Sequence, residues 1–161
     1  MNTKFIGNVG EAFVLAKLVE MGIPVYQQFG DNEPADYIIL VNNKPIKIQV
    51  KTSTSFKNGK IQFELCSSTM HRKNGVRHIY TIDEVDAFLC YDFVNKNIFL
   101  IRNDGSFYNI NIRYDQPKNN QYSKVHNYKD FLLCEESLYK LADSIHYRNI
   151  YILVITIPIT R

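Results

Sequence analysis

The spacing of apolar residues along the chain predicts a helix near the N-terminus. Apolar side chains recur three and four positions apart over residues 8–20, with Asn8 as the N-cap and Gly22 as the stop. Glu11 falls inside the apolar arc, which predicts a carboxylate directed at the core and in need of a partner. The alternative is a rim position, where Glu11 in the first turn would interact with the helix dipole. The arc comprises Ala12, Leu15, Ala16, Leu18 and Val19.

Two runs of branched residues then predict a β-hairpin whose open end carries polar side chains. The runs cover residues 36–41 and 46–52, and residues 42–45 have the chemistry of a tight turn. A turn over those four positions places Asp36 opposite Lys51. Gln49 points the same way as Lys51, because alternate residues of a strand share a face. The three polar side chains are therefore expected to lie together.

The remaining apolar pattern predicts further strands and a second helix. Strands are predicted over residues 25–29, 61–65, 87–92, 98–102 and 107–113, with a turn at Asn58-Gly59. A polar loop over residues 114–128 precedes a helix over 128–144, and the branched residues 150–159 predict a buried strand or a subunit interface. This order predicts an α/β (α+β) fold with a central mixed or mainly antiparallel sheet flanked by helices. We expect one domain over residues 1–161, with residues 146–161 as a candidate interface.

Composition places the chain among intracellular globular proteins. Its 161 residues are 45% hydrophobic and 22% charged, which is ordinary for a chain with one buried core. No run is long enough to span a membrane and the N-terminus lacks a signal-peptide pattern, so we expect no membrane partner. The three cysteines, Cys66, Cys90 and Cys134, are widely spaced and odd in number, which predicts reduced thiols and a cytoplasmic location.

Positive charge is concentrated in and just after the predicted hairpin. Residues 44–77 carry eight Lys or Arg against one acid, Glu64, whereas residues 1–43 and 78–145 are each net −3. Such a block suits the phosphate backbone of DNA, and a solvated surface is the alternative interpretation. The candidate DNA-contacting residues are Lys57, Lys60, Arg72, Lys73, Arg77, His78 and Lys118.

A zinc site is a weaker interpretation of part of the same region. The residues that could form it are Cys66, His71, His78 and Cys90, but no compact Cys-x-x-Cys pair supports the arrangement. His71 and Arg72 could also belong to a histidine-based nuclease site, although the pattern that surrounds such a site is missing.

The polar residues of the hairpin carry a resemblance to a known superfamily of enzymes. Pro34-x-Asp36, followed by Gln49-Val50-Lys51 on the next strand, resembles the PD-(D/E)xK signature of metal-dependent nucleases, and Glu11 on a preceding helix completes the set. With Gln49 in place of the usual acid, the chain is most similar to group I intron-encoded homing endonucleases of that superfamily. The resemblance covers about the first half of the chain and implies a restriction-endonuclease-like core.

The resemblance implies a magnesium-dependent DNA endonuclease in which Mn²⁺ can substitute for Mg²⁺. Glu11, Asp36, Gln49 and the backbone carbonyl of Val50 would hold the cation, because hard divalent ions prefer oxygen ligands. Lys51 would orient the attacking water and stabilise charge in the transition state. Gln49 keeps an acceptor oxygen but lacks a negative charge, so we expect weaker metal binding with cleavage retained.

Several functions are open to these residues. A site-specific homing endonuclease on double-stranded DNA would need a dimer or tetramer, because one small domain covers too few base pairs. A structure-selective nuclease of the junction-resolvase or restriction type would use the same residues and follow DNA shape. A non-catalytic DNA-binding protein would explain Gln49. The plainest interpretation leaves Asp36 and Lys51 as a cross-strand ion pair of little consequence.

Overall fold

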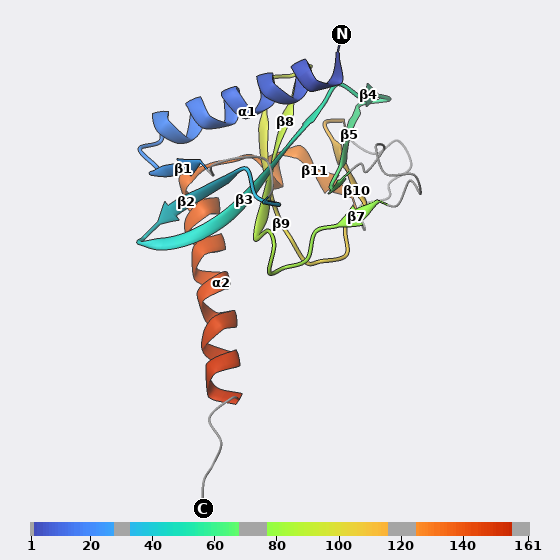
Figure 1. Cartoon of the computed structure of the whole chain (residues 1–161). Coiled ribbons are helices and arrows are strands. Elements are labelled where there is room, and N and C mark those ends of the chain that lie inside the picture. Colours follow the sequence, from blue (N-terminus) through green and yellow to red (C-terminus); the bar gives the residue numbers. More distant parts are fainter. Residues whose placement is uncertain (1, 28–32, 68–76, 116–124, 156–161) are drawn as a thin grey trace, which may run out of the picture.

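A five-stranded mixed sheet forms the centre of the molecule (Figure 1). The computed structural model describes residues 2–27, 33–67, 77–115 and 125–155, with side chains described up to residue 145 in the last range. The central pair, β3 and β8, is parallel, and every other neighbouring pair in this sheet is antiparallel. In spatial order the strands are β1 (Val25–Gln27), β2 (Tyr37–Val41), β3 (Lys44–Ser53), β8 (Ala87–Asp92) and β9 (Ile98–Arg102).

A second sheet of four strands packs against one face of the first. Ile61 and Phe63 from this sheet share a buried cluster with Phe88 and Phe99 from the central sheet. In spatial order its strands are β11 (His126–Asn127), β10 (Asn109–Arg113), β5 (Lys60–Glu64) and β4 (Phe56–Lys57). A separate antiparallel pair is formed by β6 (Cys66–Ser67) and β7 (His78–Ile79).

Two helices cover the opposite face of the central sheet. Leu18 of α1 (Thr3–Glu20) and Leu141 of α2 (Glu135–Ile155) belong to one buried cluster with Ile48 of β3. The C-terminal part of α2 projects away from both sheets (Figure 1). Within the described residues, neither helix is long and apolar enough to cross a membrane.

The layered arrangement explains the continuous burial of β8. All of its residues are buried because it lies between the helices on one side and the second sheet on the other. Ala87, Leu89 and Tyr91 face the helices, while Phe88 and Cys90 face the second sheet. A strand covered on both faces reads as a continuous apolar run, as the sequence does here. The bounds predicted for β8 and β9 are confirmed.

The first helix begins earlier than predicted, and its buried face is rotated from the predicted arc, with Leu18 common to both. Its N-cap is Asn2, whose side chain accepts a hydrogen bond from the Lys4 amide at 3.0 Å. Glu11 consequently lies in the third turn, too far from the N-terminus to interact with the helix dipole. The buried stripe is Gly10, Val14 and Leu18, because Gly10 lets the helix approach β3 closely. Of the predicted arc, Ala12, Ala16 and Val19 are exposed.

The hairpin is shifted by one residue in each strand relative to the prediction. Its turn consists of Asn42 and Asn43 alone, both with positive φ (51° and 61°), as two-residue hairpin turns require. Lys44 therefore pairs with Val41, and the same register places Asp36 opposite Gln49. The prediction that Asp36 lies opposite Lys51 was wrong. The shift totals two residues, so the predicted faces are kept.

The C-terminal third departs furthest from the predicted pattern. Tyr128–Asp130 is a 3-10 helix, and residues 131–133 follow β9 instead of opening the second helix. The Leu100 amide donates a hydrogen bond to the Phe131 carbonyl at 2.8 Å, and this segment covers an edge of the sheet that would otherwise be open. The helix begins later, at Glu135, and continues through residues 150–155, which overturns the strand that was one of the two alternatives predicted there. Residues 156–159 of that predicted strand lie outside the described residues.

Candidate active site

Asp36 and Gln49 meet across the hairpin on the face directed away from α1. The Asp36 amide donates to the Ile48 carbonyl at 2.9 Å, which fixes the end of β2 against β3. Asp36 Oδ2 accepts hydrogen bonds from Gln49 Nε2 at 2.5 Å and from the Val50 amide at 2.6 Å. Gln49 Nε2 also donates to the Val50 carbonyl at 3.2 Å. One carboxylate, one amide and one backbone carbonyl therefore converge at the end of the hairpin.

Burial controls the ionisation of Asp36. Desolvation raises the pKa of this carboxyl group, and the hydrogen bond from the Val50 amide and the positive charge of Lys51 partly offset that rise. A divalent cation bound beside the carboxylate would favour its ionised form in the same way.

Lys51 lies on the same face, held by groups from two later segments. Its Nζ donates to the Tyr80 hydroxyl at 3.2 Å and to the Cys66 carbonyl at 3.3 Å. The ammonium also lies 4.7 Å from the centroid of the Tyr80 ring, a cation–π distance. Burial lowers the pKa of Lys51, while the negative charge of Asp36 acts in the opposite direction. The hydrogen bonds of the Lys51 ammonium go to Tyr80 and Cys66, so these residues position Lys51, and not a cross-strand ion pair with Asp36.

Glu11 approaches this region from the helix side of the sheet. The Tyr37 hydroxyl donates to the Glu11 backbone carbonyl at 3.3 Å. Burial raises the pKa of Tyr37 to about 12, and the charges of Glu11 and Asp36 contribute to the rise. Tyr37 is thus near both carboxylates, since each charge acts on its phenol. The structure brings Asp36, Gln49 and Val50 into direct contact, places Lys51 near enough for its charge to act on Asp36, and places Glu11 next to Tyr37.

The converging groups have the chemistry of a site for a hard divalent cation. The Asp36 carboxylate, the Gln49 side-chain carbonyl and the Val50 carbonyl are all oxygen donors of the kind that Mg²⁺ accepts. Gln49 now directs its Nε2 toward Asp36, so the amide must rotate to present its oxygen. In the described part of the chain, no group of three or more His, Cys, Asp or Glu side chains could hold a metal ion. A site here would therefore depend on amide and backbone oxygens.

The predicted DNA-contacting residues have different surroundings. Lys57 is exposed and Lys60 is half-buried on the second sheet. Arg77 forms an ion pair with Glu64 at 3.7 Å, and His78 Nε2 lies 2.9 Å from Glu84 Oε2. The remaining members, Arg72, Lys73 and Lys118, lie outside the described residues, as does His71 of the zinc interpretation.

Sequence reasoning did not identify the two tyrosines beside the site. Tyr37 directly follows Asp36, and strand alternation alone places it on the opposite face, toward α1. Tyr80 comes 29 residues after Lys51, and no local pattern connects the two. Tyr80 directly follows β7, so its contact with Lys51 depends on the pairing of β6 with β7, in which Cys66 lies opposite Ile79.

Comparison with known proteins bears on the family and the fold of this chain. The PD-(D/E)XK endonuclease family matches the chain over residues 1–134. The solved structure of a bacterial homing endonuclease, I-Ssp6803I, superposes with a TM-score of 0.71 at 18% sequence identity, covering 92% of this chain and 99% of that one. That similarity confirms the predicted restriction-endonuclease-like fold. No match was found among curated proteins. The matched segment contains the whole hairpin site and most of the chain, so the protein belongs to the PD-(D/E)XK endonuclease family.

Proposed function

We propose that this chain is a site-specific endonuclease that cuts double-stranded DNA with a divalent metal, Mg²⁺ or Mn²⁺ in its place. The observation that carries the proposal is the convergence of Asp36, Gln49 and the Val50 carbonyl on one face with Lys51. Membership of an endonuclease family supports nuclease chemistry. Structural similarity to a homing endonuclease supports the choice of a specific duplex site as substrate.

Each side chain has a distinct role in this proposal. Asp36 and Gln49 would hold the cation with the Val50 carbonyl, and Glu11 would bind it directly or through water. A cation there would supply Lewis-acid stabilisation of the scissile phosphate and an activated water. Lys51 would orient that water and stabilise charge on the phosphate, since Tyr80 and Cys66 hold its ammonium in one position.

The protein would act inside the cell as a homodimer or homotetramer. The C-terminal part of α2 projects beyond the two sheets (Figure 1), and residues 150–155 read Ile-Tyr-Ile-Leu-Val-Ile. An apolar helix that leaves its own core is stabilised by packing against another apolar surface, and a second copy supplies one by symmetry. Two copies would also supply the two sites that a double-strand cut requires.

A non-catalytic DNA-binding protein is the second candidate function. Gln49 Nε2, a hydrogen-bond donor, lies between two oxygens that could otherwise bind a cation. This arrangement satisfies Asp36 with no metal bound. If Gln49 kept this orientation and excluded the metal ion, the protein would bind DNA without cleaving it.

The two functions are separated by cleavage of a plasmid library that contains candidate duplex sites. We expect linear product with Mg²⁺, none with EDTA, and none from Asp36→Asn, which should still bind DNA. The matched control is Asp83→Asn, which changes an exposed carboxylate and should leave cleavage intact. Retained cleavage by Asp36→Asn would refute the site.

Two further outcomes of the same assay would each establish a different function. Tight, salt-sensitive binding with no cutting by the wild-type chain would establish the binding protein. Cutting confined to branched DNA, tested in parallel, would establish a structure-selective nuclease.

A further inference from the structure

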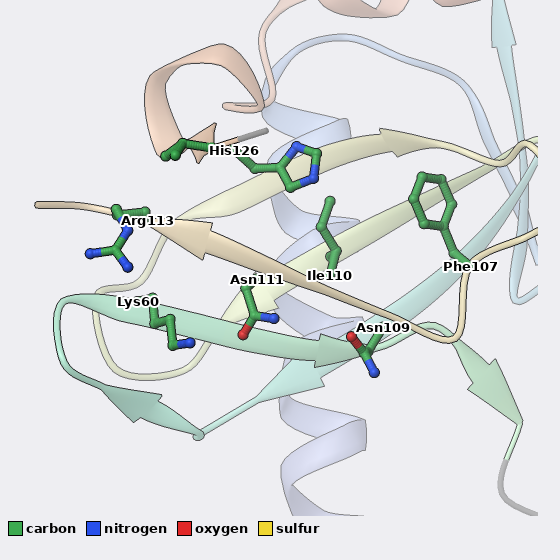
Figure 2. A pocket seen from close by; sticks show the side chains of 8 residues that line it. Lys60, Phe107, Asn109, Ile110, Asn111, Arg113 and His126 are labelled. Atoms are coloured by element: carbon green, nitrogen blue, oxygen red, sulfur yellow. The ribbon is translucent and has the colours of Figure 1, made fainter. Parts of the chain in front are cut away.

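The outer face of β5 and β10 carries amide and basic side chains in register. Asn111 pairs with Gln62, and Arg113 pairs with Lys60, across the antiparallel strands. The residues between them on each strand, Ile61 and Ile112, point inward and are buried. The outer side chains therefore form one continuous polar surface, and Figure 2 shows Lys60, Asn111 and Asn109 following one another along the two strands.

The arrangement of positive charges on this face is the one expected of an anion-binding surface. Lys60 and Arg113 lie directly opposite each other, and like charges in that position destabilise a sheet. Among the ion pairs between described residues, neither of these two has an acidic partner. The acid on the same strand, Glu64, forms an ion pair with Arg77. The fold gains nothing from two facing cations, whereas a phosphate backbone would stabilise both.

A hollow of about 320 Å³ lies beside the outer face along β10. Its lining combines the outer residues Lys60, Asn109, Asn111 and Arg113 with Phe107, Ile110 and His126, so the hollow extends past this face to the other side of β10 (Figure 2). β5 and β10, here called the ribbon, are the two inner strands of the four-stranded sheet, flanked by the two-residue strands β11 and β4. The outer face of the ribbon is therefore the part that can be presented to the major groove of B-DNA, which is about 12 Å wide. Asn and Gln each combine a donor and an acceptor in one amide, which matches the N6 and N7 positions of adenine.

The ribbon is connected to the candidate active site. Cys66, whose carbonyl accepts from Lys51, follows β5 after a single intervening residue. Gln62 is four residues before Cys66, a span of about 13 Å along an extended strand. Gln62 is thus no more than about 13 Å along the chain from a residue that contacts Lys51, so bases read there would lie near the scissile phosphate.

We propose that the outer face of β5 and β10 enters the major groove and reads base edges through Gln62 and Asn111. Lys60 and Arg113 bind backbone phosphates at the far end of the ribbon. This inference rests on the proposed function, because it assumes that duplex DNA is the substrate. It adds the residues that select the sequence, which are separate from those that cut it.

The test is selection of duplexes by the full-length protein in EDTA, where binding is measured without cleavage. The probe is a pool of duplex DNA with a 30-base-pair random region. Gln62→Ala and Asn111→Ala should each lose preference at one or two adjacent positions, by about 5- to 150-fold, the worth of a bidentate base contact. Lys60→Gln should weaken binding to all sequences and lower the salt slope by about one.

The matched control is Gln27→Ala, an exposed glutamine on β1 at the edge of the other sheet, which should keep the wild-type motif. The inference is overturned if the ribbon variants keep every preference, or if the wild-type chain enriches no motif. Cleavage of the plasmid library with Mg²⁺ is scored separately. A chain that cuts DNA while its ribbon variants keep the wild-type motif would retain its proposed function and lose this inference.

Discussion

Gln49 is the residue at which this chain departs from its family signature. Its amide nitrogen donates to Asp36 Oδ2 and to the Val50 carbonyl, and so occupies the space between two oxygens. A glutamate at this position would place two carboxylates at hydrogen-bonding distance, where only a proton or a cation could separate them. The amide thus satisfies Asp36 in the metal-free fold, and in the proposed site it would lower the affinity for a metal ion.

Gln49→Glu should therefore make folding stability depend on metal. Without a divalent ion the variant loses the hydrogen bond to Asp36 and gains a repulsion, a cost of about 1–3 kcal/mol. With Mg²⁺ the added carboxylate should bind the ion, restore the melting temperature and keep cleavage active at lower Mg²⁺ concentrations than wild type requires. Thermal unfolding in EDTA and in Mg²⁺ measures the effect. Gln27→Glu is the exposed control, and equal melting temperatures of Gln49→Glu in both conditions would contradict the expectation.

Tyr80→Phe isolates the contribution of the group that positions Lys51. The substitution removes the hydroxyl that accepts from the ammonium but keeps the aromatic ring beneath it. Loss of a hydrogen bond to a charged group is worth about 1.5–3 kcal/mol, so cleavage should slow about tenfold or more. DNA affinity should not change, because Tyr80 is buried. Single-turnover cleavage beside an equilibrium binding assay measures both, and a loss confined to binding would contradict this role.

At the scale of elements, the contact between α1 and β3 determines where Glu11 lies. A Cβ at Gly10 would overlap the Thr52 hydroxyl, so Gly10→Ala must push the helix off the strand. We expect a loss of about 1–3 kcal/mol in unfolding free energy, as for other overpacked cores. Cleavage should fall as well, because Glu11 is the next residue along the helix.

Two further variants test that expectation. Gly7→Ala is the control on the same helix: its Cβ would meet nothing within 4 Å, so it should stabilise the protein by about 0.5–1 kcal/mol. Adding Thr52→Ala to Gly10→Ala should recover part of the loss, since it removes the overlapping hydroxyl and the Cγ2 atom 3.1 Å from the new Cβ but keeps the Thr52 Cβ at 2.9 Å. If the losses of unfolding free energy from the two substitutions add in the double variant, the contact between residue 10 and Thr52 is not the cause of the destabilisation.

The strands of the central sheet show which features could be predicted from the sequence. The hairpin of β8 and β9 was predicted with its observed bounds, because branched and aromatic runs flank turn residues at 95–97. Strand alternation predicted that Asp36, Gln49 and Lys51 share a face, and the resemblance to the PD-(D/E)xK signature supplied the roles proposed for them. Their register was not predicted, since two asparagines and a proline allow several turns, and the positive φ of Asn42 and Asn43 decided between them.

Other features depended on tertiary structure that no local pattern encodes. Residues 150–155 are apolar at every position, so neither a period of two nor one of 3.6 is visible. Residues 131–133 have the pattern of a helix start, but they pair with β9 and so cover an edge of the sheet that would otherwise be open. Tyr80 reaches Lys51 only through the pairing of β6 and β7.

At the scale of the whole molecule, the projecting end of α2 carries the proposed assembly. If a second copy covers residues 150–155, then Ile152→Glu places a charge in an apolar contact and should dissociate the assembly. Light scattering on the eluting peaks of a sizing column should show a dimer or tetramer for the wild-type chain and a smaller species for the variant. Cleavage of supercoiled plasmid should change from linear product to nicked circles, because one subunit cuts one strand.

Tyr139→Glu is the control that separates the interface from the helix itself. Tyr139 lies on the first half of α2, where the helix covers the central sheet, and its side chain is 41% exposed. A charge there leaves both the core and the projecting end intact, so the assembly and the linear product should persist. A wild-type chain that elutes as a monomer, or an Ile152→Glu variant that keeps its mass, would instead mean that α2 projects for a reason other than self-association.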